Sequence, residues 1–170
     1  MLSRQGKEAN VIPRARQTTP SPEQPAPVLL VSPDQNDHLV LPEILNHPHW
    51  EWRQSRSCRQ ALERFSDKSI TVLICERDQR DGCWRDLLNA SAELLDPPNV
   101  IVCSRLADDH LWAEVLNLGG YDVLMKPLDR EEVARVVFSA WRSWTAKQVA
   151  RKSRPKVLRA GSAPSFGSVA

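Results

Sequence analysis

The sequence lacks the long apolar runs that membrane and exported proteins carry. None of its 170 residues lies in a stretch close to the ~18 apolar residues that a membrane-spanning helix needs, and the mean hydropathy is -0.43. Residues 1–27 contain basic residues with no apolar run after them, which excludes a secretory signal. We therefore expect a soluble, cytoplasmic protein without a membrane partner.

Glycine is also scarce, and its placement limits the enzyme classes open to the chain. The six glycines form no GxGxxG pattern, no phosphate-binding loop of the Walker type and no nucleophile elbow. Cofactor-dependent enzymes are therefore disfavoured. We expect a protein that is not an enzyme and that holds no cofactor, apart from a weak Mg²⁺ site considered below.

Cysteine is too sparse for a disulfide scaffold. The sequence has four cysteines, none with CxxC spacing: Cys58, Cys75, Cys83 and Cys103. Cys75 and Cys103 lie inside apolar runs, where small buried thiols are common. We expect all four to be reduced and structural.

Charge and proline divide the chain into three parts. Residues 1–27 contain five prolines, four basic and two acidic residues, and residues 149–170 contain five basic residues and no acid. Neither segment has a core-forming pattern, so we expect both to be disordered. The net charge of the whole chain is +2, so residues 28–148 are acidic and form the expected domain. Because the basic charge lies in the tails, we do not expect nucleic acid as a partner.

Inside the expected domain, short apolar runs alternate with segments of helical periodicity. Three runs without charge predict strands buried on both faces, at 28–31, 70–75 and 100–103. Two weaker strands fit at 50–53 and 121–124. Between the strands and after the last one, apolar residues recur at helical spacing. The first helix, at 34–46, contains Pro42, which we expect to kink or restart it.

Five strands alternating with five helices predict a parallel sheet with helices on both faces. The natural choice is an α/β, flavodoxin-like (βα)5 doubly wound fold with strand order 2-1-3-4-5. Such sheets place their sites at the carboxyl ends of the strands, near the switch in strand order. The candidate site residues are therefore those that end or follow the strands: Asp34, Glu76, Asp78, Ser104 and Lys126.

Three segments at these strand ends carry a family resemblance. They are 121–129 (YDVLMKPLD), with its Lys-Pro ending, 72–82 (VLICERDQRDG) and 100–104 (VIVCS). In this order and at these separations, they resemble the receiver domain of two-component response regulators. The resemblance covers roughly residues 28–147.

The resemblance implies a phosphoryl-transfer site that is incomplete here. In that family a strand-end aspartate accepts the phosphoryl group, acidic residues hold Mg²⁺, and a lysine and a hydroxyl contact the phosphoryl oxygens. The resemblance places Glu76 at the acceptor position, Ser104 at the hydroxyl position and Lys126 at the lysine position. The acidic pair after the first strand is replaced by Ser32-Pro33. Asp34 and Glu76 are then the candidate metal ligands and form a poor octahedral cage, so we expect weak Mg²⁺ binding at most.

These departures favour a stand-alone pseudo-receiver, a signalling module that acts by protein–protein interaction. The expected partners are signalling proteins such as a histidine kinase or a downstream regulator. We also expect the longer glutamate side chain to form a permanent ion pair with Lys126. The alternative is a phospho-accepting single-domain response regulator that uses Glu76, or Asp78 if the alignment slips by two residues.

Overall fold

A computed structural model describes residues 25–66 and 69–153 of the chain. Most of the two segments expected to be disordered lies outside these residues. Within them, no helix is long and apolar enough to cross a membrane. The order of the elements is β1 (Ala26–Val31), α1 (Gln35–Ile44), β2 (Trp50–Ser55), α2 (Cys58–Arg64), β3 (Val72–Glu76), α3 (Trp84–Ala92), β4 (Asn99–Ser104), α4 (Asp109–Asn117), β5 (Asp122–Met125) and α5 (Arg130–Ser153).

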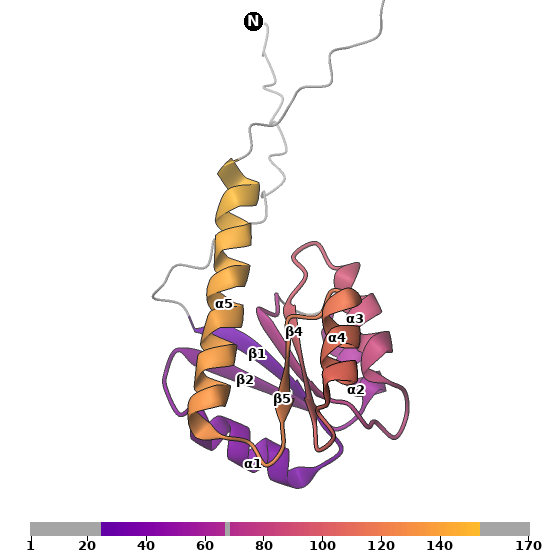
Figure 1. Ribbon diagram of the computed structural model, residues 1–170. Coiled ribbons are helices and arrows are strands. Elements are labelled where there is room, and N and C mark those ends of the chain that lie inside the picture. The colour runs from indigo at the N-terminus through magenta and orange to yellow at the C-terminus, as the bar shows by residue number, and fades with distance from the viewer. Residues whose placement is uncertain (1–24, 67–68, 154–170) are drawn as a thin grey trace, which may run out of the picture.

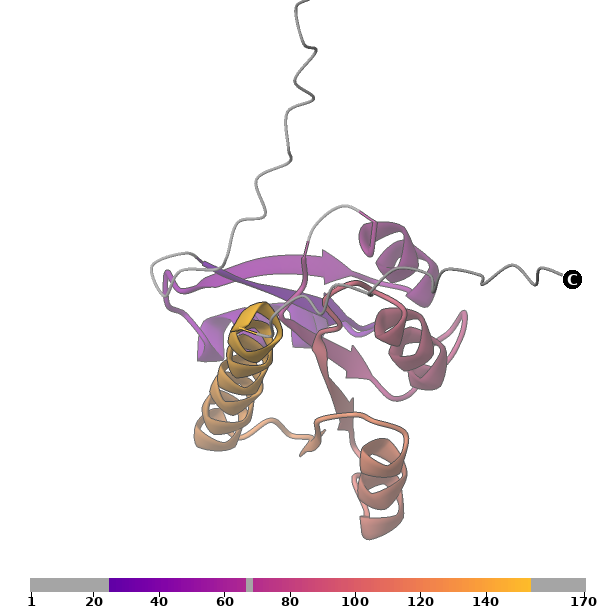
Figure 2. The same ribbon diagram turned by 90° about the horizontal axis from the view of Figure 1, so that it is seen from above.

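The strands form one parallel sheet in the order β2-β1-β3-β4-β5, which confirms the predicted fold. Helices α1 and α5 cover one face, and α2, α3 and α4 cover the other (Figures 1 and 2). The register pairs Val31 with Cys75, Glu76 with Cys103 and Ser104 with Met125. The carboxyl ends of four strands therefore meet at one edge of the sheet.

Two apolar cores, one on each face, hold the layers together. Alternate residues of β1 point to opposite faces, so Leu29 packs with α2 and α3, and Leu30 packs with α1 and α5. Trp84 of α3 lies in the core on the face covered by α2, α3 and α4, and it is 1% exposed. Each Leu or Ile side chain buried in this way contributes ~1.5–3 kcal/mol. The predicted buried strands are confirmed, because β1, β3 and β4 are almost entirely buried.

Helix α1 runs through Pro42 without ending there. Asp34 caps the helix by accepting a hydrogen bond from the Asn36 amide at 2.9 Å. Pro42 has no N–H to donate to the carbonyl of His38, one turn earlier. That carbonyl instead accepts from the side chain of Gln54 in β2 at 3.2 Å. A side chain from the neighbouring strand thus replaces the helix bond that proline removes.

Two glycines, Gly119 and Gly120, follow α4 and lead the chain into β5. Gly119 has a φ of 95, in the left-handed region that favours glycine. A Cβ on Gly120 would lie 2.4 Å from a methyl carbon of Val115, and the Gly120 amide donates to the Val115 carbonyl at 2.8 Å. This tight turn sets where β5 begins and hence where Lys126 emerges from the sheet.

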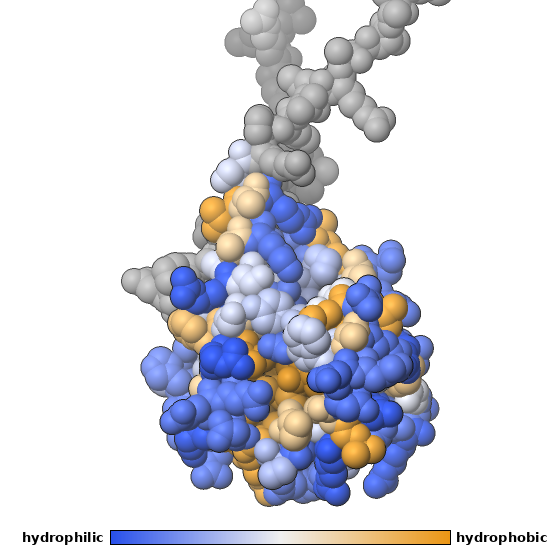
Figure 3. Space-filling view, in the orientation of Figure 1, coloured by the Kyte–Doolittle hydropathy of each residue, from blue (hydrophilic) through white to orange (hydrophobic). Residues whose placement is uncertain are grey.

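Apolar side chains are exposed beside β5, the outer strand at one side of the sheet. Figure 3 shows them in the hollow between α5 and α4. Trp112 of α4 and Met125 of β5 line a pocket there and are 51% and 52% exposed. Asp108 and Asp109, at the start of α4, lie along the same pocket. This side of the domain therefore offers apolar contact area with acidic residues around it.

Regular structure extends beyond both expected limits of the domain, 28 and 148. β1 already begins at Ala26, because the Ala26 amide donates to the His49 carbonyl at 2.6 Å and the Pro27 carbonyl accepts from the Thr71 amide at 2.9 Å. α5 continues to Ser153 although the apolar pattern stops earlier. Near its end, Arg151 forms an ion pair with Asp96 at 2.8 Å. Periodicity alone missed both extensions, because neither depends on an apolar stripe.

We expect a fragment of residues 25–153 to unfold at the same temperature as the full chain, and a fragment of residues 28–148 to unfold several degrees lower. The shorter fragment loses Ala26, which is 3% exposed, and the Pro27 carbonyl that Thr71 binds. Thermal denaturation followed by circular dichroism measures the difference. Equal melting temperatures for the two fragments would contradict the view that residues 25–27 and 149–153 belong to the folded domain. A lower midpoint for 25–153 than for the full chain would show that the omitted residues contribute.

Candidate functional site

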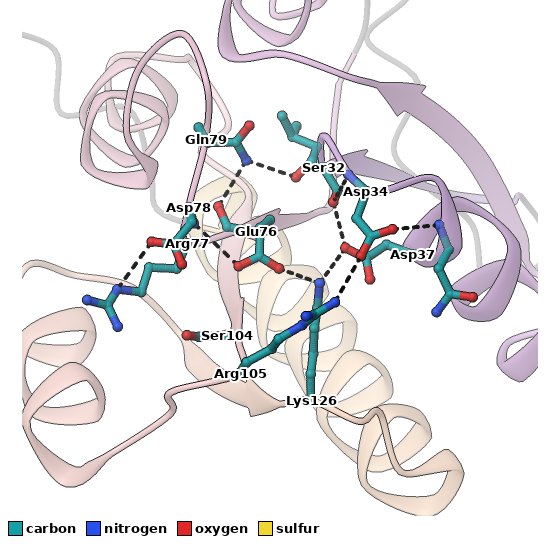
Figure 4. A network of polar contacts seen from close by, with 12 residues as sticks. Ser32, Asp34, Asp37, Glu76, Arg77, Asp78, Gln79, Ser104, Arg105 and Lys126 are labelled. Atoms are coloured by element: carbon teal, nitrogen blue, oxygen red, sulfur yellow. Dashed lines mark hydrogen bonds and ion pairs between the residues drawn. The ribbon is translucent and has the colours of Figure 1, made fainter.

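A cluster of buried charges lies at the edge where the strand ends meet (Figure 4). Lys126 follows β5, and its ammonium group forms ion pairs with Glu76, at the end of β3, and with Asp37, in the first turn of α1. The Lys126–Asp37 distance is 2.5 Å. The three side chains are only 5–10% exposed. The ion pair expected between Glu76 and Lys126 is therefore present, and a second carboxylate joins it.

Asp37 is the residue that sequence reasoning missed. Its carboxylate accepts a hydrogen bond from the Ser32 hydroxyl at 2.5 Å and another from Lys126. The N-cap at Asp34 fixes the start of α1 and so aims the first turn of the helix at the strand ends. Acidic residues are common in first turns because they complement the helix dipole, so Asp37 gave no separate signal in the sequence.

The two carboxylates change the acid–base behaviour of Lys126. Burial lowers the pKa of Lys126, but the hydrogen bonds and charges of Asp37 and Glu76 outweigh burial and raise the pKa above that of an ordinary lysine. Because the folded-state pKa is the higher one, the contribution of the Lys126 ammonium group to the stability of the fold is fully present at pH values below about 10.4, the usual lysine pKa. This stabilisation is lost only as the pH rises through the folded-state value. The ammonium group is thus charged throughout the physiological range.

Ser32-Pro33 stands where the resemblance implies two acids, and Ser32 has a structural role. Ser32 is fully buried, and its hydroxyl accepts from the Asp34 amide at 3.0 Å while donating to Asp37. Its carbonyl is 2.8 Å from Nε2 of His38. The end of β1 is therefore tied to α1 by hydrogen bonds and supplies no carboxylate.

Asp78 lies close to Glu76 in sequence, but its side chain does not reach Lys126. Its backbone amide donates to the Glu76 carboxylate at 3.3 Å. The Asp78 side chain is 81% exposed, and its ionic partner is Arg77 at 3.8 Å. Among the described residues, Glu76 is thus the acidic side chain of this loop that faces the buried lysine.

Ser104 is at the expected strand end, yet its hydroxyl is engaged elsewhere. The residue is 1% exposed, and its hydroxyl accepts from the Leu106 amide at 3.0 Å. Its carbonyl accepts from the Lys126 amide at 2.9 Å, which aligns β4 with the end of β5. Figure 4 shows its side chain directed away from the ion pairs. The structure brings Glu76 and Lys126 together and leaves Ser104 outside the cluster.

The candidate metal ligands do not fit a Mg²⁺ ion. One Asp34 oxygen caps α1, and the other is 3.5 Å from the guanidinium of Arg105. The Glu76 carboxylate is bound by Lys126 and by the Asp78 amide. Within residues 25–66 and 69–153, no group of three His, Cys, Asp or Glu side chains is arranged to hold a metal. The positive charge that carboxylates at this edge require is supplied by Lys126 itself.

We expect Lys126→Met to destabilise the domain by about 3–5 kcal/mol, because it leaves two buried carboxylates without their cation. Urea denaturation at neutral pH measures the loss. Lys152→Met is the matched control: Lys152 is exposed in the last turn of α5, and its change should cost less than about 0.5 kcal/mol. Equal small effects of the two substitutions would contradict the role given to the buried cluster.

Comparison with known proteins supports the fold independently of these residues. No protein-family model and no curated protein sequence matches the chain. Several solved structures match it. The signal receiver domain of an HD domain-containing protein from Pseudomonas fluorescens Pf-5 aligns with a TM-score of 0.67 at 20% identity, over 74% of this chain and 93% of that one.

Two further structures agree with this match. The signal receiver domain of a putative LuxO repressor protein from Vibrio parahaemolyticus aligns with a TM-score of 0.69 at 16% identity, over 74% of this chain and 97% of that one. A CheY-like response regulator receiver domain protein from Methanospirillum hungatei JF-1 aligns with a TM-score of 0.66 at 15% identity, over 73% and 99%. The chain therefore has the fold of the response regulator receiver domains.

Proposed function

We propose that this chain is a pseudo-receiver, a signalling module of a two-component phosphorelay system that acts by protein–protein interaction. The observation that carries the proposal is the buried Lys126 ammonium, which already binds the carboxylates of Glu76 and Asp37. In the family that the sequence resembles, this lysine contacts the incoming phosphoryl group. Here its hydrogen bonds are committed to the protein's own acids.

The identity of the acceptor-equivalent residue also supports the proposal. Glutamate is longer than aspartate by one methylene, which moves its carboxylate by about 1.5 Å. Misplacements near 1 Å can lower a rate by about 100-fold. The Glu76 carboxylate points at Lys126 (Figure 4), and its side chain is 10% exposed, so a phosphodonor has little access to it.

A permanent ion pair would replace the switch of an ordinary receiver with a fixed bias. A ligand or modification shifts a conformational equilibrium only through its different affinity for the two states. Glu76 and Asp37 supply fixed negative charge to Lys126 without any modification. The module then presents one conformation to its partner, whether or not a kinase is active.

The partner we propose is another signalling protein in the cytoplasm, such as a histidine kinase or a downstream regulator. The exposed apolar side chains of Trp112 and Met125, next to Asp108 and Asp109, suit contact with a protein surface that carries apolar and basic groups. In this proposal the domain itself catalyses no reaction.

A phospho-accepting regulator is the second candidate, and one observation favours it. Asp78 is 81% exposed directly after the acceptor-equivalent position, so a small phosphodonor can reach its carboxylate. Against it, the cation beside Asp78 is Arg77 at 3.8 Å, on the surface, and Lys126 is occupied by other acids. The two candidates differ in whether a phosphoryl group is ever attached.

Incubation with Mg²⁺ and acetyl phosphate should leave the mass of this protein unchanged. An ordinary receiver domain, used as the positive control, gains about 80 Da per phosphoryl group under the same conditions. Intact-protein mass spectrometry makes the comparison. A gain that Asp78→Asn abolishes would favour the second candidate, and a gain that Glu76→Gln abolishes would make Glu76 an acceptor; either result would overturn the pseudo-receiver proposal.

Glu76→Gln should perturb amide NMR signals in three elements, because removal of its charge releases one side of Lys126. We expect shifts at neighbours of position 76, at the end of β5 and in the first turn of α1, where Asp37 lies. Glu93→Gln is the matched control, since Glu93 is exposed at the end of α3 and should affect only its neighbours. If shifts in Glu76→Gln stay equally local, the proposed lock does not exist.

A further inference from the structure

Two cysteines lie together on the face of the sheet opposite α5. Cys58 is the first residue of α2, and Cys83 is the N-cap of α3. The Cys58 sulfur lies 3.9 Å from the carbonyl oxygen of Cys83. These residues are far apart in sequence and belong to helices that pack side by side (Figure 2).

The segment before Cys83 is fixed against the start of α2. The Asp81 carboxylate accepts from the Cys58 amide at 3.0 Å and from the Arg59 amide at 3.1 Å. At Gly82, a Cβ would lie 3.1 Å from the Cys58 Cβ and 3.2 Å from its sulfur. Because Gly82 has no side chain, none is interposed there between Cys58 and the backbone that leads to Cys83.

The four thiols differ in their access to solvent. Cys58, Cys75 and Cys103 are at most 3% exposed, whereas Cys83 is only half-buried. Burial, followed by the charges of Asp81 and Asp86, raises the pKa of Cys58 to about 11. Of the four sulfurs, that of Cys83 is therefore the one that an oxidant in solution can reach most readily.

We propose that Cys83 and Cys58 are a redox pair in which a peroxide oxidises Cys83 and Cys58 resolves the product to a disulfide. In the first step the Cys83 sulfur attacks the peroxide: an S–O bond forms, the O–O bond breaks, and the thiol proton leaves with the departing alcohol or water. In the second step the Cys58 sulfur attacks the sulfenic sulfur: the S–S bond forms, the S–O bond breaks, and water leaves. Two thiols lose two hydrogens, and one peroxide is reduced.

The disulfide would join the start of α2 to the end of the loop that follows Glu76. This loop runs from the end of β3 to Cys83, and Gln79 holds its middle by donating to the Glu76 carbonyl at 2.9 Å. A covalent link at its far end removes freedom from the unfolded chain and restrains the loop in the folded one. The loop beside the candidate site would thereby respond to oxidation.

Peroxide treatment of the full chain, followed by alkylation and tryptic digestion, tests the pair. We expect a loss of about 2 Da in the intact protein and a linked pair of peptides, 57–59 with 81–85, that a reducing agent separates. Cys75 and Cys103 should remain free for alkylation after unfolding. Oxidation should raise the thermal midpoint by about 5 °C or more. A link between other cysteines, only intermolecular dimers, or no oxidation beyond that of methionine would overturn the proposal.

Two variants separate the loss of the disulfide from any loss of folding. Cys83→Ser retains a favoured N-cap residue for α3, so it should fold normally and show neither the mass loss nor the stabilisation on oxidation. Cys58→Ala keeps Cys83 without its resolving partner. Peroxide should then oxidise the Cys83 sulfur further to the sulfinic acid, which adds about 32 Da to the mass of the protein. If Cys58→Ala shows no oxidation at position 83, Cys83 is not the sulfur that peroxide attacks, and the proposal is wrong.

Discussion

The arrangement of the site depends on one buried ammonium group held between two carboxylates. Lys126 comes from the end of β5, Glu76 from the end of β3 and Asp37 from α1, so the contact joins three elements that are distant in sequence. A buried charge is costly unless an opposite charge accompanies it. Exchange of Lys126 alone would therefore leave two buried carboxylates without their cation, whereas exchange of either acid leaves Lys126 paired with the other one.

The negative charge at this edge comes partly from a helix. The strand that would supply two acids in the resembled family ends here in Ser32-Pro33, and Ser32 instead donates a hydrogen bond to Asp37. The carboxylate thus reaches the same edge from the first turn of α1. Asp37 and Glu76 both face Lys126, and Asp34 serves as the N-cap of α1. The chain thus combines the fold of receiver domains with acids that approach this edge from both a strand and a helix.

The loop after β3 connects the two proposals. It begins at Glu76 in the buried charge cluster and reaches Cys83 in the thiol pair. Its middle is bound to β1 and β3 by Gln79, whose amide donates to the carbonyls of Val31 and Glu76. Asp81 binds it to α2. A loop restrained at so many points suits a module that presents one fixed surface, and a covalent bond at its end would restrain it further.

Local patterns in the sequence predicted the fold and part of the site. Three charge-free apolar runs, two weaker runs and helical periodicity predicted the five strands, because these features are local to each segment. The rules for parallel sheets then predicted the strand order and the edge where Glu76 and Lys126 meet. The contacts of Asp37, Ser104 and Cys83 come from the way the elements pack together, and local patterns did not predict them. Asp37 looked like any first-turn acid, the Ser104 hydroxyl turned to its own loop, and Cys83 came to lie beside Cys58. Such contacts depend on how helices sit on the sheet, and no periodic pattern records the relative placement of two packed elements.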